Sequence, residues 1–187
     1  MSIAVAIQKN RRLVLGTDSL YTFGDRRIPE DVVASKIRRV GAAYLAATGW
    51  GIYDDILNDY LSRAGEADLS SRPAVFAFFM AFWKELHEHY PFVKDQPEDG
   101  EHSPFGELDA SFLIVSPQGI FHVSGNMTVT EFARYYAIGS GCEYALGAAS
   151  VLYGTEADSK TICRESVEAA IKFNIYCGGD VNIVELD

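Results

Sequence analysis

Residues 2–18, SIAVAIQKNRRLVLGTD, form a recognisable hairpin pattern directly behind Met1. Two apolar segments, at residues 3–7 and 13–15, flank a polar stretch at residues 9–12. This alternation of apolar runs and a turn predicts two paired β-strands. Chain ends usually fray unless the fold holds them in place. We therefore expect a rigid strand at the beginning of the chain, and a rigid end is able to carry chemistry.

The rest of the chain divides into separate groups of strands and helices. Extended segments are predicted at residues 36–40 and 43–48, helices at 52–63 and 72–90, a loop at 91–107, strands at 111–115 and 119–123, helices at 142–153 and 158–173, and a last strand at 181–186. Grouped rather than alternating elements are typical of an α+β fold. Two helix pairs that cover two central sheets would bury this much apolar sequence. The expected architecture is a single domain over residues 1–187.

Charge and cysteine content exclude several classes of function. The net charge is -10, which argues against nucleic acid and against anionic membrane surfaces as partners, because both require clustered Lys and Arg. No apolar run reaches the length of a membrane span, and no signal peptide is recognisable. The three cysteines, Cys142, Cys163 and Cys177, are widely spaced and odd in number, which favours free thiols in a reducing compartment. A cytoplasmic protein is expected.

Ser2 is the first candidate for chemistry. The ordinary interpretation is a small residue behind the initiator Met1. The alternative is an N-terminal nucleophile: removal of Met1 would leave Ser2 with a free α-amine, whose pKa is ordinarily about 7.7–8.0. Such an amine can accept the hydroxyl proton, so that one residue supplies both the nucleophile and the base.

Asp18 and Lys36 are the candidates for tuning that amine. Asp18 lies one hairpin away from Ser2, a spacing that returns it to the neighbourhood of the chain start. A buried Lys36 close to Ser2 would lower the pKa of the α-amine by like-charge repulsion, and an ionised Asp18 would keep Lys36 protonated. The ordinary alternatives are a turn-forming aspartate and a solvated lysine.

Two glycine-containing turns precede predicted helices. In AATGWG, Gly49 is either a simple turn residue or a donor whose N–H stabilises an oxyanion. In AIGSG, Ser140 is either a helix cap or part of a hydroxyl relay. His87 and His89 are two residues apart on a predicted helix and point in different directions, so no metal site is expected. Attack by Ser2 with its own amine as the base would need no cofactor.

Three blocks of this sequence together resemble a known family: SIAVAIQKNRRLVLGTDS, SKIRRV with AATGWG, and AIGSGCEYALGAA with FNIYCGGDVNIVEL. They resemble proteasome β-type subunits, specifically the bacterial branch of HslV and the betaproteobacterial proteasome homologue. The segments DSLYTFGDRRIP and SPQGIFHV are most similar to the homologue branch. The resemblance implies an N-terminal nucleophile hydrolase fold, a four-layer αββα sandwich. It also implies homo-oligomeric stacked rings around an inner chamber.

The resemblance assigns roles to residues by position: Ser2 falls on the family's N-terminal threonine nucleophile, Asp18 and Lys36 on its aspartate and lysine, Gly49 on the oxyanion-hole glycine, and Ser140 on the serine of the GSG block. The chain departs from the family in three places. Serine replaces threonine at the nucleophile, so the methyl that restricts its rotamer is missing. Asn174 and Cys177 stand where the proteasomal pattern has aspartate and serine, and HslV also departs at the aspartate position.

The leading functional hypothesis is a self-compartmentalising endopeptidase of the threonine or serine type, acting on peptides or unfolded proteins. No ATP-binding glycine loop occurs in this chain, so an ATP-dependent unfoldase partner would be a separate protein. Two alternatives stay open. One is a catalytically silent ring subunit that serves as a scaffold or binds a partner. The other is an amidase or acyl-transfer enzyme on the same fold.

Overall fold

The first hairpin forms as the sequence predicts. In the computed structural model, which describes residues 2–24, 26–28, 35–65, 67–90, 93 and 106–186, strand β1 (Ile3–Lys9) pairs antiparallel with β2 (Arg12–Asp18). Two residues connect the strands, Asn10 with φ 53° and Arg11 with φ 66°. Two successive left-handed residues make the tight turn whose twist matches that of paired strands. Met1, whose removal is predicted, lies outside the described residues, as does most of the predicted 91–107 loop.

The remaining elements follow in separate groups, as expected for an α+β chain: β3 (Thr22–Phe23), β4 (Arg26–Arg27), β5 (Ile37–Val40), β6 (Ala43–Gly49), α1 (Ile52–Ala64), α2 (Arg72–His89), β7 (Ala110–Ser116), β8 (Gly119–Val123), β9 (Val129–Phe132), β10 (Tyr135–Gly139), α3 (Cys142–Tyr153), α4 (Ser159–Phe173) and β11 (Val181–Leu186). Ser71 caps α2 and Asp158 caps α4 through their side-chain oxygens. Such caps satisfy backbone N–H groups that the helix itself leaves unpaired.

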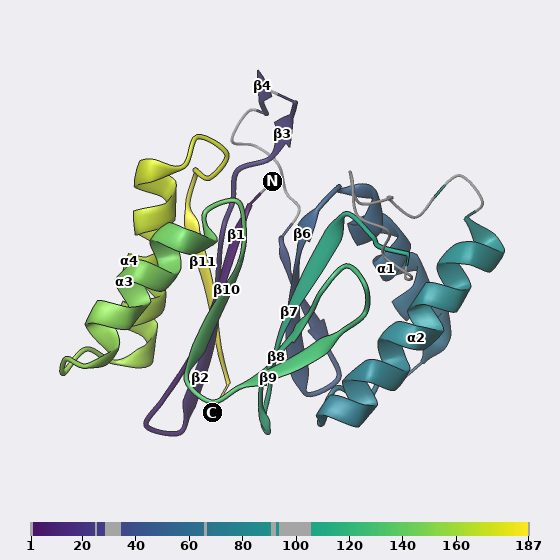
Figure 1. Cartoon of the computed structure of the whole chain (residues 1–187), viewed down its shortest axis with the longest axis horizontal. Coiled ribbons are helices and arrows are strands. Elements are labelled where there is room, and N and C mark those ends of the chain that lie inside the picture. The colour runs from purple at the N-terminus through teal and green to yellow at the C-terminus, as the bar shows by residue number, and fades with distance from the viewer. Residues whose placement is uncertain are drawn as a thin grey trace.

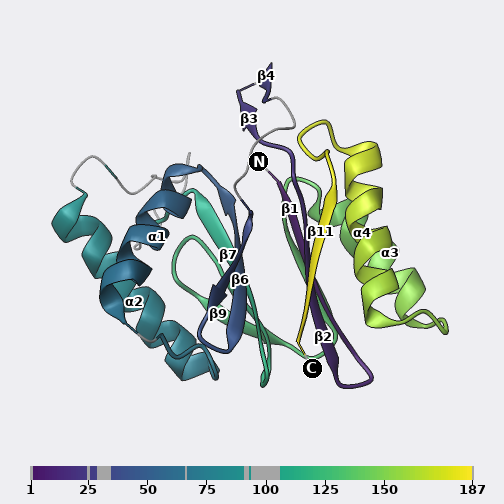
Figure 2. The same cartoon turned by 180° about the vertical axis from the view of Figure 1, so that it is seen from behind.

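Two antiparallel sheets lie face to face between two pairs of helices (Figure 1). One sheet has the strand order β10-β1-β2-β11 and the other β5-β6-β7-β8-β9. Helices α3 and α4 cover the first sheet and helices α1 and α2 cover the second, which Figure 2 shows from behind. The architecture is a four-layer αββα sandwich, and the predicted fold class is confirmed.

Strand β1 is buried on both of its faces. Ile3, Val5 and Ile7 pack towards α3 and α4, whereas Ala4 and Ala6 face the opposite sheet. Small alanines on the inner face let the two sheets approach each other. A strand buried on both sides reads as a continuous apolar run rather than as an alternating one. This is why residues 3–7 are uniformly apolar.

The other sheet buries an aromatic cluster beneath α2. Phe79 and Phe82 of α2 and Phe112 of β7 are fully buried, and the rings of Phe79 and Phe112 are 4.7 Å apart between centroids. Each buried phenylalanine contributes roughly 1.5–3 kcal/mol through removal from water. Among the helices that the structure describes, none is both long and apolar enough to span a membrane.

The sequence did not predict strands β9 and β10. β9 extends the sheet that holds β8, and β10 then crosses to the other sheet and pairs with β1, with Ile3 opposite Gly139. This crossover brings the GSG segment beside the beginning of the chain. Pairing between residues so far apart leaves no periodic signal in either segment.

Candidate active site

Ser2, Lys36 and Asp18 meet at one end of the inner strands. Ser2 directly precedes β1, Asp18 ends β2, and Lys36 directly precedes β5 of the facing sheet. Lys36 Nζ donates to Ser2 Oγ at 2.8 Å and to Asp18 Oδ1 at 2.8 Å. The hairpin register places Ala4 opposite Thr17, which brings Asp18 across from the first residues of the chain. The sequence-based expectation that these three residues lie together agrees with this geometry.

Lys36 is a buried cation with all of its donors engaged. Its exposed fraction is 4%, and its third hydrogen bond goes to the carbonyl oxygen of Leu20 at 2.5 Å. Three acceptors match the three N–H groups of an ammonium. Burial lowers the pKa of Lys36 below its ordinary 10.5, and the Asp18 carboxylate opposes this shift without overcoming it. The aromatic ring of Tyr21 adds a contact at 5.2 Å from Nζ.

Asp18 is fully buried and bound at both carboxylate oxygens. Oδ1 accepts from the Ile3 N–H at 3.2 Å in addition to Lys36, and Oδ2 accepts from the Gly178 N–H at 3.1 Å. A buried carboxylate is tolerated only with such partners. Asp18 therefore ties together β1, the lysine and the loop that precedes β11.

Ser140, Asn174 and Cys177 form a neighbouring polar group on the α3–α4 side. Ser140 Oγ lies 3.5 Å from the carbonyl oxygen of Ser2, 3.5 Å from Asn174 Oδ1 and 3.9 Å from Cys177 Sγ. Asn174 Nδ2 donates to the Ser140 carbonyl at 2.6 Å, and its Oδ1 accepts from the Tyr176 N–H at 2.9 Å. The Asn174 side chain thus holds the GSG segment through its hydrogen bond to the Ser140 carbonyl.

Cys177 is buried and close to this group without being placed as a nucleophile. Burial raises the pKa of its thiol to about 11, so that the neutral form prevails at ordinary pH. Its sulfur lies where a side chain on Gly141 would collide with it. The cysteine therefore fills space beneath the GSG turn, where its sulfur contacts Ser140.

Gly49 ends β6 on the facing sheet, close to the same point. Its φ of +122° is strained for any residue with a side chain, and a Cβ there would overlap the Asp109 carbonyl oxygen. The preceding residue, Thr48, and the carbonyl of Ser2 both contact the position that a side chain on Gly139 would occupy. Gly49 therefore directly follows Thr48, whose methyl lies close to the same point beside Gly139 as the Ser2 carbonyl.

Sequence reasoning missed four groups that shape this site: the Leu20 carbonyl, the Gly178 N–H, the Tyr21 ring and the close backbone approach at Gly139. The sequence did hint at Gly139 and Gly178, since GSG and CGG each place a glycine beside a candidate residue. No sequence pattern pointed to the Leu20 carbonyl or to the Tyr21 ring. Within the described part of the chain, no cluster of three His, Cys, Asp or Glu side chains could hold a metal ion.

Comparison with known proteins relates the whole chain to bacterial proteases. No protein-family model matches it. The sequence is 26% identical over 185 residues to the ATP-dependent protease subunit HslV of a Sulfurovum species, covering 94% of this chain and 92% of that protein. It is also 26% identical to the HslV subunit of Hyphomonas neptunium, covering 98% of this chain and 91% of that protein.

Solved structures extend this similarity. The structure of Thiobacillus denitrificans BPH in complex with epoxomicin is 31% identical in sequence, with a TM-score of 0.89, and the match covers 99% of this chain and 98% of that one. Eukaryotic HslV from Trypanosoma brucei has a TM-score of 0.66 at 18% identity, covers 99% of both chains and supports the fold alone.

Proposed function

The chain belongs to the proteasome β-type and HslV family, in the branch of its Thiobacillus relative, and from this premise we propose that it is a peptidase whose nucleophile is Ser2. The substrates are peptides or unfolded proteins. The observation that carries the proposal is the hydrogen bond from Lys36 Nζ to Ser2 Oγ at 2.8 Å, together with the ion pair from the same nitrogen to Asp18.

The proposed base is the α-amine of Ser2, freed by removal of Met1. Lys36 donates its three hydrogens to three acceptors, so an ammonium in this position has no lone pair with which to take the Ser2 proton. Its positive charge instead lowers the pKa of a nearby α-amine and keeps that amine unprotonated near neutral pH. Asp18 orients Lys36 and stabilises its charge.

The reaction then proceeds in two steps. As Ser2 Oγ bonds to the scissile carbonyl carbon, its proton passes to the α-amine, and the carbonyl oxygen becomes an oxyanion that the Gly49 N–H stabilises. The amide C–N bond breaks when the leaving amine receives that proton. Water, deprotonated by the same α-amine, hydrolyses the acyl ester and restores the Ser2 hydroxyl. Ser140, with Asn174 and Cys177 behind it, holds the backbone of Ser2.

Three matched proteins test this mechanism on fluorogenic peptides: one that begins at Ser2, one that retains Met1, and the Ser2→Ala variant of the first. We expect cleavage only by the protein with a free Ser2 amine, with kcat reduced at least about 10³-fold in the other two. Ser2→Thr serves as the conservative control and keeps activity, because it retains the hydroxyl and adds the rotamer-restricting methyl.

The outcomes separate the alternatives. If the Met1-retaining protein is as active as the processed one, the α-amine is not the base, and a neutral Lys36 takes that role. Equal rates for wild type and Ser2→Ala refute the nucleophile. Cleavage of small amides but not of peptides favours the amidase alternative. Epoxomicin, which the Thiobacillus relative binds, provides an independent ligand for intact-mass and thermal-shift measurements.

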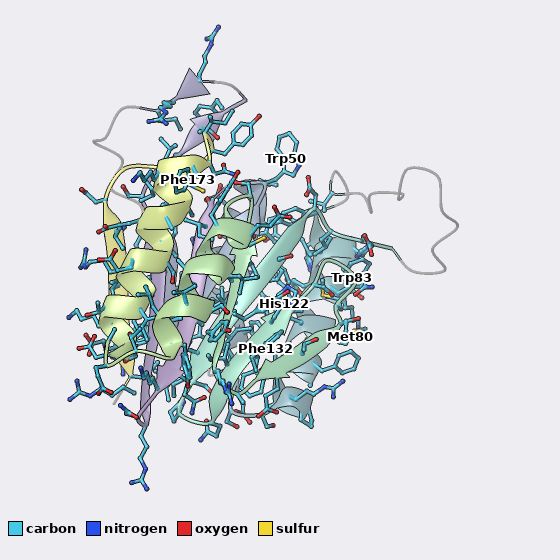
Figure 3. All side chains as sticks on the ribbon, turned by 60° about the vertical axis from the view of Figure 1, so that its left-hand side comes forward. Trp50, Met80, Trp83, His122, Phe132 and Phe173 are labelled. Atoms are coloured by element: carbon cyan, nitrogen blue, oxygen red, sulfur yellow. The ribbon has the colours of Figure 1, made fainter. Side chains whose placement is uncertain are left out.

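We also propose that the chain assembles into homo-oligomeric stacked rings in the cytoplasm, with a separate ATP-dependent unfoldase as partner, in line with the ATP-dependent protease subunits to which it is similar. Large exposed apolar side chains on the outer helices support assembly, among them Phe76 and Met80 of α2 and Val151 of α3. Met80 is labelled in Figure 3. Native mass spectrometry tests the assembly, and a monomer at micromolar concentration would contradict it.

A further inference from the structure

Trp50 is an exposed tryptophan in the turn that holds the candidate oxyanion donor. It directly follows Gly49 and leaves 65% of its surface exposed to solvent. Figure 3 shows its ring projecting from the upper end of the molecule, the end at which the N-terminus lies in Figures 1 and 2. Exposure of a tryptophan forgoes more stabilising free energy of burial than exposure of other side chains, because its apolar surface is the largest. An exposed tryptophan that directly follows a catalytic candidate offers a ligand apolar surface to bury.

The Trp50 ring is held in place without being buried. Its indole Nε1–H donates to Asp109 Oδ2 at 2.6 Å, and its backbone N–H donates to the carbonyl oxygen of Asp109 at 3.3 Å. Its own carbonyl accepts from the Tyr53 N–H at 3.1 Å at the start of α1. A side chain that is fixed before binding loses little conformational entropy on binding.

The chemistry around the ring selects a basic group. The Asp109 carboxylate is exposed and lies at the edge of the indole, where it adds negative charge to a ring face that already attracts cations. The chain as a whole carries a net charge of -10. An aromatic face with a carboxylate at its edge suits the ammonium of lysine or the guanidinium of arginine better than it suits an acidic group.

We infer that Trp50 and Asp109 form a binding site for a basic side chain of the peptide that Ser2 attacks. The inference rests on the proposed function, because it names the class of substrate that the same site accepts. Continuity with that site supports it: Thr48 contacts the Gly139 position beside the Ser2 carbonyl, and Trp50 is two residues further along the same segment. The Trp50–Asp109 site thus determines specificity and takes no part in bond breaking.

Steady-state kinetics test the inference on peptides that differ only in one residue, Arg, Leu or Glu, placed in turn at each of four positions on the acyl side. We expect wild type to prefer Arg at one of these positions. Trp50→Ala raises KM for that peptide roughly 2- to 30-fold with little change in kcat, as loss of a cation–π contact predicts. Trp50→Phe keeps an aromatic ring face, so we expect a smaller rise in KM for the same peptide.

Two further variants serve as controls. Asp109→Asn keeps an acceptor for the indole N–H but removes the charge, so we expect the preference for Arg over Leu to weaken while the protein stays folded. Trp83→Phe changes the other tryptophan of the chain, on α2, and leaves KM for all peptides unchanged. Unchanged KM in Trp50→Ala, or a change of oligomeric state in place of a KM effect, overturns the inference and leaves the peptidase proposal intact.

A binding measurement separates the inference from the proposed catalysis. The chain has two tryptophans, so that Trp83→Phe leaves Trp50 as the sole indole. In the Ser2→Ala/Trp83→Phe protein, we expect the fluorescence of Trp50 to change on addition of the Arg peptide and not of the Glu peptide. This response supports the inference even if wild type hydrolyses nothing. Equal responses to both peptides, or none to either, overturn it.

Discussion

At the scale of single residues, the candidate site is organised around one buried lysine. Lys36, which precedes β5 of the facing sheet, donates hydrogen bonds of 2.5–2.8 Å to Ser2, to Asp18 at the end of β2 and to the carbonyl of Leu20. Tyr21 closes a further side of the ammonium with its ring. Behind Tyr21 lies a second, partly buried ion pair between Arg38 and Asp54, whose N–O distance is 2.9 Å. The charge state of Lys36 therefore depends on several neighbours.

Tyr21→Leu removes the aromatic face and keeps apolar volume at the same position. We expect a lower pKa for Lys36, because the cation loses its favourable contact with the ring while its burial and the nearby carboxylates of Asp18 and Asp54 stay in place. If activity requires protonated Lys36, the alkaline limb of the kcat/KM profile moves to lower pH by roughly 0.5–1 unit. Tyr21→Phe keeps the ring and the wild-type profile. An identical profile in the leucine variant would rule out a role for the ring.

At the scale of elements, the close contact between β2 and α4 depends on a glycine. Gly16 faces α4, and a Cβ at this position would lie 2.5 Å from Cys163 Sγ, but only at ordinary distances from Ile183 and Val167. The Gly16 backbone does not require a left-handed conformation, so the sulfur is the main obstacle to a side chain. Cys163 is fully buried and makes a weak contact from its sulfur to the carbonyl oxygen of Val5.

This packing predicts that Gly16→Ala and Cys163→Ala compensate each other. We expect Gly16→Ala alone to destabilise the fold by about 1–3 kcal/mol through overpacking, and Cys163→Ala alone by about 1–2 kcal/mol through a small cavity. In the double variant the new methyl occupies the space of the lost sulfur, so the total cost is clearly smaller than the sum. Urea unfolding of the four proteins measures the coupling. Additive costs would show that the backbone, and not the sulfur, excludes a side chain at Gly16.

At the scale of the whole molecule, the two sheets are joined through aromatic side chains between β8, β9 and β10. The rings of Phe132 and Tyr136 stack at 3.9 Å between centroids, and His122 lies 5.0 Å from Tyr136. Figure 3 labels His122 of β8 and Phe132 of β9. Burial lowers the pKa of His122 below its ordinary 6.5. A titrating group thus sits where one sheet passes into the other.

His122 makes the stability of the protein depend on pH. Between its lowered folded-state pKa and 6.5, the unfolded chain binds a proton that the folded chain does not, so stability falls as pH falls through this window. The slope is at most about 1.4 kcal/mol per pH unit for one group. We expect the free energy of unfolding to fall less between pH 6.5 and 5.5 in His122→Gln than in wild type. The stability that the variant loses through altered packing is measured at pH 7.5 and subtracted first. Urea unfolding at the three pH values measures it, and an unchanged slope would contradict the prediction.

Much of this architecture follows from local patterns in the sequence. The apolar runs around residues 9–12 predicted the β1–β2 hairpin, and helical spacing predicted α1 to α4 within a few residues of their observed ends. The hairpin length also brought Asp18 back towards Ser2. These features can be predicted from the sequence because they depend on residues close together along the chain. Side-chain periodicity and turn geometry are set within a few residues.

Other features arise only when distant segments meet in the folded chain. The pairing of β10 with β1, the Gly178 N–H on Asp18 and the ring of Tyr21 beside Lys36 join residues that share no local pattern. Burial of Lys36 belongs here too, because a lysine is ordinarily solvated until two sheets close over it. Local chemistry selects the elements, whereas the environment of each ionisable group depends on which elements exclude water from it.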